Sequence, residues 1–368
     1  MKPIKLNINT KSENYPIIIG SNIIKNLDIY LKRNSISFNQ CLLVIDKNVK
    51  SKMILKITRS LKDKKISKIY FNPSEKNKNQ NNVNKILKIL FNKNFSREDC
   101  LITVGGGITG DVGGFAASLF KRGLQFINFP TTLLSQVDSS IGGKTGINTI
   151  QGKNLIGSFY QPKIVISDTE FLKTLPRREI ICGYGEILKH SIILNKKFFK
   201  YLNNNASKIL DLKTPFIEKA ILESCKIKKT VVEKDEKEKG IRKILNFGHT
   251  FAHAYEAALG YSKKLNHGEA VILGINSATK FSMLNKLIKN DEYELISDHI
   301  KRMKLPLDIN NYFSSKNLSK ILSFMTKDKK NTTSKINLIL LKKIGAATIN
   351  GQYNIEKIKK FIKKELIN

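Results

Sequence analysis

The segment that decides the fold is Leu101-Ile102-Thr103-Val104 followed directly by Gly105-Gly106-Gly107-Ile108-Thr109-Gly110-Asp111-Val112-Gly113-Gly114. The first four residues predict a buried strand, and a helix is expected over Phe115–Phe120. Glycines at such a turn let the backbone approach a pyrophosphate closely, and the helix N-terminus favours its negative charge. The spacing is not the usual GxGxxG, so a tight turn without a ligand is the alternative.

Further strands and helices alternate around this segment. Helical spacing of Val83, Ile86, Leu87 and Leu90 predicts a helix over Val83–Asn92. The expected strands are Tyr15–Ile19, Cys41–Asp46, Lys68–Phe71, Cys100–Val104, Gln125–Pro130 and Ile164–Asp168. This alternation predicts an α/β domain over residues 1–174, with a Rossmann-like, doubly wound parallel sheet.

Beyond Leu175-Pro176 the pattern changes, and residues 175–368 are expected to form a mainly α-helical domain. A short strand pair, Lys335–Leu341 with Ala346–Asn350, is expected near the end. The expected helices are Pro215–Asp235, Thr250–Leu259, Gly268–Leu284, Asp291–Met303, Asn317–Lys327 and Asn354–Glu365.

Composition points to the cytoplasm. No apolar run is long enough to predict a membrane span, and the first residues lack the apolar stretch of a signal peptide. The cysteines Cys41, Cys100, Cys182 and Cys225 are far apart and form no CxxC pair, which is typical of reduced structural thiols.

The net charge of +35 raises nucleic acid as an alternative partner. The positive charge is nearly all lysine, with only eight arginines, and it is spread over the whole chain. Nucleic-acid sites favour arginine, so we attribute the charge to composition and expect no nucleic acid as primary partner. Positive charge near a site would still attract an anionic substrate.

Histidines indicate a metal centre. Of five histidines, His249, His253 and His267 fall within nineteen residues, and the first two share a helix face. Glu186 is an acid in an otherwise apolar run. Two histidines and one glutamate would satisfy a catalytic divalent metal that keeps an open position, but the sequence does not say which histidines bind.

Other polar residues predict anion and nucleotide contacts. Asp46 and Asn48 follow one expected strand and Glu75 and Lys78 another, where carboxylates can bind ribose or adenine. Several cationic and amide residues have apolar, glycine or metal-site neighbours in the sequence. Such residues suit a substrate with phosphate and carboxylate groups. They are Lys144, Lys153, Asn154, Lys189, Lys228, Arg242 and Asn246.

Taken together, the chain resembles the 3-dehydroquinate synthase family of sugar-phosphate cyclases from about Val44 to Gly345. The segments that carry the resemblance are GGGITGDVGGF, FPTTLLSQVDSSIGGKTGIN, GKNLIGSFYQP, LPRREIICGYGEILKH, DEKEKGIRKILNFGHTFAHAYE, HGEAVILGI and DKKN. Gly185 stands where alanine is usual, His190 where tyrosine is usual, and Leu119-Phe120 where a more polar pair is usual. These departures affect local packing rather than the assigned chemistry.

The resemblance implies roles for particular residues. Zinc, with cobalt as an alternative, would be bound by Glu186, His249 and His267, and His253 and Glu238 would serve in proton transfer. Arg122 matches an arginine near the dimer-related site. The implied catalytic or substrate-binding residues further include Lys144, Lys153, Asn154, Lys189, Lys228, Arg242, Asn246, Lys329 and Lys330. The implied NAD contacts are Asp46, Asn48, Glu75, Lys78, Gly106, Gly107, Ile108, Asp111, Thr131, Thr132, Asp138, Lys144, Lys153, Phe171 and Thr174.

The implied enzyme is a phosphate-eliminating carbon–oxygen lyase of the shikimate pathway, acting as a cytoplasmic homodimer. It converts 3-deoxy-D-arabino-heptulosonate 7-phosphate to 3-dehydroquinate and phosphate by transient oxidation with NAD, elimination, re-reduction and aldol closure. NAD is returned unchanged. Alternatives are a cyclase that makes a cyclitol, a metal-dependent polyol dehydrogenase, and a basic nucleic-acid-binding protein. The last gives no reason for the histidine cluster.

Overall fold

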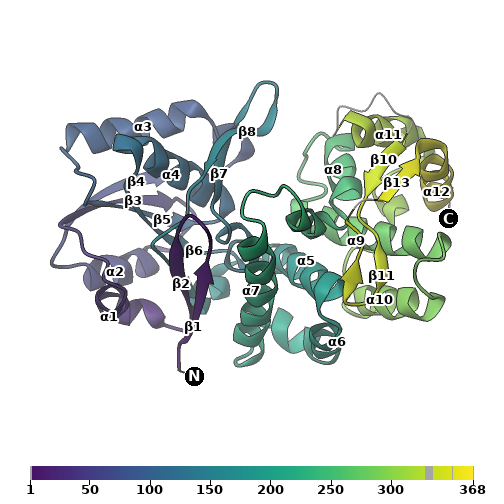
Figure 1. Ribbon diagram of the computed structural model, residues 1–368, viewed down its shortest axis with the longest axis horizontal. Helices are drawn as coiled ribbons and strands as arrows, with labels where there is room; N and C mark the ends of the chain where they lie inside the picture. Colours follow the sequence, from purple (N-terminus) through teal and green to yellow (C-terminus); the bar gives the residue numbers. More distant parts are fainter. Residues whose placement is uncertain (1, 328–334, 350, 368) are drawn as a thin grey trace. The chain divides into compact units, whose positions relative to one another are not determined.

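The computed structural model describes residues 2–327, 335–349 and 351–367, and contacts divide the chain into two units (Figure 1). Unit 1 comprises Met1–Ile180 and Leu212–Lys237, and unit 2 comprises Ile181–Asp211 and Glu238–Asn368. The chain therefore passes more than once between the units. The boundary predicted after residue 174 divides the chain only once, and this division into two domains remains a prediction.

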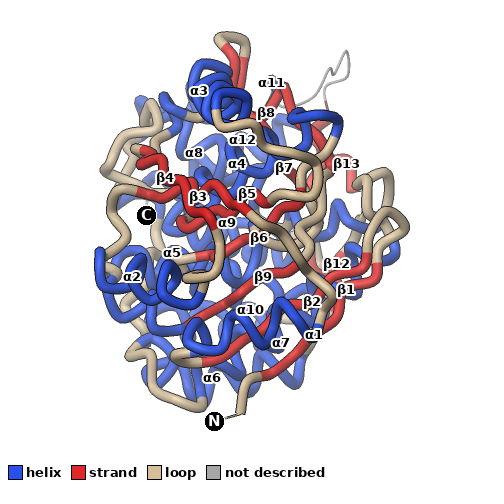
Figure 2. Tube along the Cα trace, turned by 90° about the vertical axis from the view of Figure 1, so that its left-hand side faces the viewer, coloured by secondary structure: helices blue, strands red, loops and turns tan. Residues whose placement is uncertain are grey.

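Unit 1 is built on a seven-stranded sheet in the order β1-β2-β9-β6-β5-β3-β4. Only β1 runs antiparallel to its neighbour, and the other six strands are mutually parallel. Figure 2 shows these strands following one another across the unit. The strands are β1 (Ile4–Asn9), β2 (Asn14–Gly20), β3 (Gln40–Asp46), β4 (Lys65–Phe71), β5 (Cys100–Gly105), β6 (Gln125–Pro130) and β9 (Ile164–Asp168).

Alternating side chains of these strands feed two apolar cores, one on each face of the sheet. Leu43 and Ile45 pack with the α2 residue Ile57 on one face, whereas Leu42 and Val44 pack on the other face with residues of α3 and α4. Helices on both faces bury both sets, as expected of a doubly wound sheet. The helices of unit 1 are α1 (Leu27–Arg33), α2 (Ser51–Ser60), α3 (Gln80–Asn92), α4 (Gly107–Leu119) and α7 (Phe216–Lys234).

The predicted strands and the helix over Val83–Asn92 are confirmed, but the start of the helix after the glycines is wrong. α4 begins at Gly107, so most of the glycine-rich segment is helical rather than a turn. The close approach of α4 to β5 explains this, because a Cβ on Gly113 would lie 2.2 Å from Cγ2 of Thr103. The glycines therefore serve helix–sheet packing as well as the turn at Gly105-Gly106.

Several elements of unit 1 were not predicted. β1 extends the sheet, and β7 (Lys144–Thr149) and β8 (Gly152–Phe159) form an antiparallel hairpin. Short helical turns complete the unit: η1 (Ile23–Asn26), η2 (Glu75–Asn77), η3 (Phe120–Arg122), the π-helical η4 (Ser135–Ser139) and η5 (Thr169–Thr174).

Unit 2 is mainly helical, as predicted. The long helix α9 is buried along most of its length, and its Phe281 meets Phe251 and Phe361 in a cluster of rings 5.3–6.4 Å apart. The helices are α5 (Arg177–Leu194), which begins in unit 1, α6 (Lys196–Leu210), α8 (His249–Ala258), α9 (His267–Leu284), α10 (Asn290–Arg302), α11 (Leu318–Lys327) and α12 (Ile355–Ile367), with the short turns η6 (Ile241–Asn246), η7 (Ile309–Asn311) and η8 (Ser315–Asn317).

The strand pair predicted near the end is only partly right, because Leu341 of the first predicted strand pairs with Ala347 of the second, but Lys335–Leu338 pairs elsewhere. β10 (Lys335–Leu338) pairs with β13 (Gly351–Asn354), and β11 (Leu341–Lys343) pairs with β12 (Ala346–Ala347). Alternation along the sequence marks residues that favour strands but does not identify their partners. Among the described residues, no helix combines the length and the apolar character needed to cross a bilayer.

Candidate functional site

Three helices of unit 2 bring together Glu186, His249 and His267, with one possible ligand atom of each lying within 4.8 Å of the others. Oε1 of Glu186 lies 3.5 Å from Nε2 of His249 and 4.0 Å from Nε2 of His267. Two ligands bonded to one zinc ion at tetrahedral angles stand about 3.3 Å apart. The donor set and its spacing therefore fit a divalent metal with an open position.

Glycines bring these helices close enough to form the cluster. A Cβ on Gly268, beside His267, would lie 2.2 Å from Cα of Cys182, one turn before Glu186 on α5. Similarly, a Cβ on Gly274 would lie 2.2 Å from the carbonyl oxygen of Gly248. Gly248 precedes α8 at φ 78°, a left-handed conformation that favours glycine. Backbone packing thus sets the positions of both histidines.

Charges around the cluster favour its role as a ligand set. Glu186 is fully buried and forms an ion pair with Lys189, one turn further along α5. Burial lowers the pKa of His249, and the positive charge of Lys189 lowers it further. A neutral imidazole keeps a lone pair for a metal. Burial also opposes protonation of His267, but the hydrogen bond and the charge of Glu256 outweigh it and raise its pKa.

His253 lies beside the cluster, but its side chain is exposed. Its ring centroid is 5.4 Å from that of His249 and 6.2 Å from that of His267. A second group of possible ligands consists of His253, Glu256 and His267. The structure therefore favours Glu186, His249 and His267 as the ligand set, because this group has no exposed member, whereas the second group includes the exposed His253.

Further polar residues of unit 2 flank α8. Arg242, on η6, is 2% exposed, whereas Asn246 is exposed and donates a 2.9 Å hydrogen bond to Oε1 of Glu238. Glu238 has φ 55°, which places it in the left-handed region. The sequence analysis singled out each of these residues, but it missed Glu256, whose only signal was its position on the same helix face as His249 and His253.

In unit 1 the predicted nucleotide residues gather at the carboxyl ends of the parallel strands. Asp46 ends β3, and burial raises the pKa of its carboxyl group, although hydrogen bonds from Asn48 and Gly106 oppose this. Thr131 follows β6 and donates a 3.0 Å backbone hydrogen bond to Gly105. A Cβ on Gly107 would lie 2.9 Å from Oγ of Ser139. The half-exposed N-terminus of α4 and the nearby carboxylate fit a dinucleotide.

A second group in unit 1 joins the loop after β4 to the β7–β8 hairpin. Lys78 is 5% exposed and contacts both Asp111 on α4 and Asn154 on the hairpin. Lys153 lies 3.5 Å from Glu75. The structure therefore brings together residues predicted for NAD and residues predicted for substrate.

The remaining predicted residues occupy varied positions. Lys228 on α7 pairs with Asp138 on η4 at 2.7 Å. Lys144 on β7, Arg122 on η3 and Thr174 on η5 are exposed. Phe171 is 1% exposed and packs in the core, so its side chain is not available to a cofactor. Ile108 and Thr132 are half-buried near the start of α4, and Lys329 and Lys330 lie outside the described residues.

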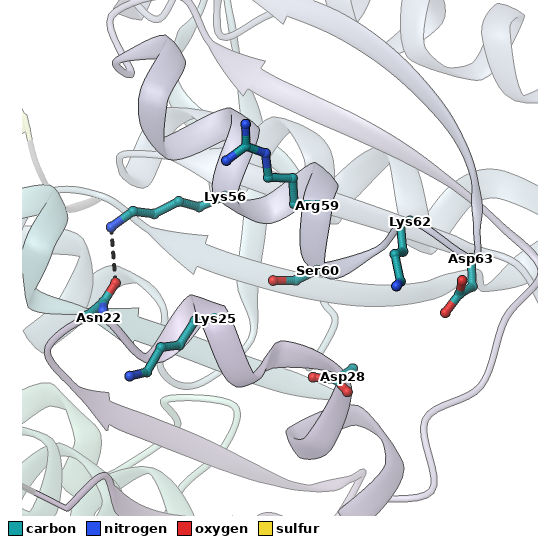
Figure 3. A pocket seen from close by; sticks show the side chains of 8 residues that line it. All are labelled: Asn22, Lys25, Asp28, Lys56, Arg59, Ser60, Lys62 and Asp63. Atoms are coloured by element: carbon teal, nitrogen blue, oxygen red, sulfur yellow. Dashed lines mark hydrogen bonds between the residues drawn. The ribbon is translucent and has the colours of Figure 1, made fainter.

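Unit 1 also has a hollow of about 410 Å³ beside α2 that the sequence did not predict. Figure 3 shows that its cations do not converge, since Lys56 turns to Asn22 at 3.0 Å while Arg59 points away. Asp28 and Asp63 supply opposing charge in the same lining. This arrangement does not define an anion site, and we assign it no function.

Similar solved structures identify the architecture. A 2-deoxy-scyllo-inosose synthase complexed with carbaglucose-6-phosphate, NAD⁺ and Co²⁺ matches 98% of this chain and 100% of its own, with a TM-score of 0.87 at 23% identity. ValA, a 2-epi-5-epi-valiolone synthase from Streptomyces hygroscopicus subsp. jinggangensis 5008 with bound NAD⁺ and Zn²⁺, matches 97% of this chain and 98% of its own, with a TM-score of 0.86 at 22% identity. The fold is that of the sugar-phosphate cyclases.

Sequence comparison gives the particular family. Residues 68–182 match the 3-dehydroquinate synthase N-terminal family, and residues 183–331 match the 3-dehydroquinate synthase C-terminal family. The 3-dehydroquinate synthase of Pelagibacter ubique (strain HTCC1062) is 64% identical over 363 residues, which cover 99% of each chain. The chain belongs to the 3-dehydroquinate synthase family.

Proposed function

We propose that this chain converts 3-deoxy-D-arabino-heptulosonate 7-phosphate to 3-dehydroquinate and phosphate, using the residues of both units described above. Its activity is that of a phosphate-eliminating carbon–oxygen lyase. The observation that carries the proposal is the convergence of Glu186, His249 and His267 in a chain with this family match. The overall reaction involves no net oxidation, so a nicotinamide cofactor is needed only in catalytic amount.

Glu186, His249 and His267 would hold one divalent ion, with zinc as the first candidate and cobalt as the second. Such an ion supplies Lewis-acid polarisation of a substrate hydroxyl or carbonyl oxygen. The similar cyclases contain Co²⁺ or Zn²⁺ together with NAD⁺, which supports this proposal. Lys189 holds the Glu186 carboxylate by an ion pair within α5, so the ligand is oriented before any ion binds.

Unit 1 would hold NAD, which supplies a reversible hydride acceptor when bound. The start of α4 presents backbone N–H groups at Gly106 and Gly107 for the pyrophosphate. Asp46 lies at the end of the neighbouring strand, where a carboxylate suits ribose hydroxyls. Further proposed contacts are Asn48, Glu75, Lys78, Ile108, Asp111, Thr131, Thr132, Asp138, Lys144, Lys153, Phe171 and Thr174.

The anionic groups of the substrate would be bound by fixed cations and amides. Arg242 is buried, and its planar guanidinium suits a carboxylate that accepts two hydrogen bonds. Lys189 and Lys228 are also buried, which limits the entropy lost when they hold a substrate. The remaining proposed contacts are Lys144, Lys153, Asn154, Asn246 and a lysine of the pair Lys329-Lys330.

Proton transfer would fall to His253 and Glu238. His253 is exposed beside the two imidazoles of the metal centre and can exchange protons with water. Glu238 is oriented by the hydrogen bond from Asn246. The elimination step needs a proton to be removed from the carbon next to a carbonyl. Both residues belong to unit 2, which also contains the proposed ligands of the metal that would polarise this carbonyl.

We also propose that the protein works in the cytoplasm as a homodimer. Arg122 is exposed on η3, which makes it available to a second copy of the chain. The experiment for the assembly is sedimentation of the purified protein, with Arg122→Ala as the variant. If wild type and Arg122→Ala both sediment as dimers and only the variant has lower activity, the result would support a role for Arg122 in the site of the second copy.

The activity itself is tested by phosphate release from the heptulosonate phosphate. We expect turnover with NAD and zinc, loss of turnover after chelation, and no net rise in absorbance at 340 nm, the wavelength at which NADH absorbs. Stoichiometric accumulation of NADH would instead indicate a polyol dehydrogenase and reject the proposal.

Arg242→Lys tests the carboxylate assignment. Loss of a charge-assisted pair in a desolvated site costs about 2–5 kcal/mol, so we expect kcat/KM to fall by about one to three decades. Zinc content and NAD affinity should be unchanged. Wild-type kcat/KM in this variant would show that Arg242 does not bind the carboxylate.

A further inference from the structure

We propose that Glu256 is a positioning residue of the metal centre: it accepts a hydrogen bond from Nδ1 of His267 and so keeps Nε2 of that ring free to bind a divalent ion. This inference rests on the proposed function, because it assumes that His267 is a ligand. It adds to that proposal a residue which none of the roles above includes.

The geometry around His267 assigns different partners to its two ring nitrogens. Nδ1 lies 3.0 Å from Oε2 of Glu256, and Nε2 lies 4.0 Å from Oε1 of Glu186. A neutral imidazole carries its proton on one nitrogen and a lone pair on the other. An ionised carboxylate can only accept, so Glu256 selects the form with the proton on Nδ1 and the lone pair on Nε2.

The distances distinguish the two carboxylates. The 3.0 Å separation at Glu256 is a hydrogen-bond distance. Oε1 of Glu186 instead faces Nε2 of both His249 and His267, at 3.5 and 4.0 Å, which are longer than a hydrogen bond. Glu256 therefore orients a ligand, whereas Glu186 is a ligand itself.

Helix geometry explains why Glu256 can reach His267. It lies seven residues after His249 on α8, which is nearly two full turns, so both side chains leave the same face. α9 begins at His267 beside that face, and the capping box formed by Asn266 and Glu269 fixes its first turn. The Glu256 side chain is only 10% exposed, so water competes little for its oxygens.

The buried Glu256 carboxylate should have a measurable effect on metal affinity. A carboxylate behind a ligand histidine fixes the orientation of the ring and raises its basicity as a ligand, and loss of such a group typically weakens metal affinity about 10–100-fold. Glu256→Gln keeps an acceptor but removes the charge, so it should recover part of the loss caused by Glu256→Ala. A residue with a purely structural role would lower stability without this graded change in affinity.

The experiment is zinc competition with a chromophoric chelator, with the full-length protein first stripped of metal. We expect the zinc Kd to rise about 10–100-fold in Glu256→Ala and less in Glu256→Gln. The matched control is Glu292→Ala, which removes a half-buried carboxylate of unit 2 that accepts a 2.9 Å hydrogen bond from the backbone of Ile344. Its zinc Kd should match wild type.

A second measurement does not depend on metal. Imidazole ¹⁵N spectra of the metal-free protein should show His267 protonated on Nδ1. Glu256→Gln should weaken that preference. This variant keeps the size of the native side chain, so it serves as the test if Glu256→Ala does not fold. Unchanged zinc Kd in both Glu256 variants would overturn the inference. So would two bound zinc ions in wild type and one in Glu256→Ala, because Glu256 would then be a ligand.

The controls separate this inference from the proposed function. If Glu186→Gln abolishes zinc binding while both Glu256 variants bind as wild type, the metal centre stands and only the role of Glu256 fails. If wild type binds no zinc, the proposed metal centre itself fails.

Discussion

The two units present their candidate functional residues in different ways. In unit 1 these residues follow the ends of parallel strands, where neighbouring loops meet along one edge of the sheet. In unit 2 they project from the faces of α5, α8 and α9, far apart in sequence. The first arrangement depends only on the order of the strands. The second depends on the distances between three packed helices and on the rotation of each helix about its own axis.

Backbone packing has different consequences in the two units. Glycines in α4 allow the helix to lie against β5 and expose backbone groups, so the proposed nucleotide site would use main-chain atoms. Gly248 and Gly268 in unit 2 allow backbones to touch so that side chains converge on one point. A site built from side chains on helices should therefore be more sensitive to single substitutions than one built from main-chain atoms.

Glu186→Gln should have the largest effect. Loss of the charged ligand removes Lewis-acid stabilisation worth several kcal/mol, so we expect kcat/KM to fall by at least about three decades. NAD affinity should change little, since the residues proposed to bind NAD lie in unit 1. Bound zinc measured by emission spectroscopy and NAD binding by calorimetry test this, and full zinc occupancy in the variant would reject Glu186 as a ligand.

Gly268→Ala should destabilise unit 2 by about 3 kcal/mol, since the new Cβ would lie 2.2 Å from backbone Cα of Cys182. Zinc affinity should fall as well, because His267 adjoins the displaced residue. Gly260→Ala is the matched control: its Cβ would meet nothing within 4 Å, and only the φ of +65° costs about 1 kcal/mol. Urea unfolding of both variants decides, and equal losses would show that the α5–α9 contact is soft.

Lys78→Met should destabilise unit 1 by about 2 kcal/mol. The side chain of Lys78 is 6% exposed and that of Asp111 is 23% exposed, so removal of the lysine leaves a largely buried carboxylate without that partner. Lys78→Met with Asp111→Asn should recover at least half of the loss, as measured by urea unfolding. The zinc affinity of the single and the double variant should match that of wild type. A change in zinc affinity would show that this ion pair of unit 1 influences the proposed metal centre of unit 2.

His299 should make the stability of unit 2 depend on pH. Burial, with a contribution from Arg302, lowers the pKa of His299 to about 4, and its neutral ring is held by Tyr184 at 2.9 Å and Asn203 at 3.1 Å. A lowered pKa gives stability that is present above the unfolded value of 6.5 and is lost as the pH falls toward 4. This group alone should cost about 2 kcal/mol between pH 8 and pH 5.

The measurement is urea unfolding of metal-free wild type and His299→Gln at both pH values. Their difference isolates His299 from the histidines of the metal centre. The variant should be less stable at pH 8 and should lose about 2 kcal/mol less than wild type on acidification. Parallel pH profiles would show that folding does not shift the pKa of His299.

The sequence by itself determined most elements and nearly all candidate residues. Largely apolar runs such as Gln125–Pro130 and Ile164–Asp168 became strands with those bounds, because strands buried on both faces are rich in apolar side chains. The clustering of His249, His253 and His267 also predicted a metal centre, since histidines are rare in this chain. These properties are local, so a single stretch of sequence carries them.

Only the tertiary structure decided which distant groups meet. The pairing of β10 with β13, the start of α4 at Gly107 and the contact of Glu256 with His267 depend on neighbours from other parts of the chain. The same holds for the choice of His249 and His267 over His253 as partners of Glu186. Helical spacing fixes which residues share a face, but the packing of helices determines which face meets a partner, and that depends on backbone contacts such as Gly268 against Cys182.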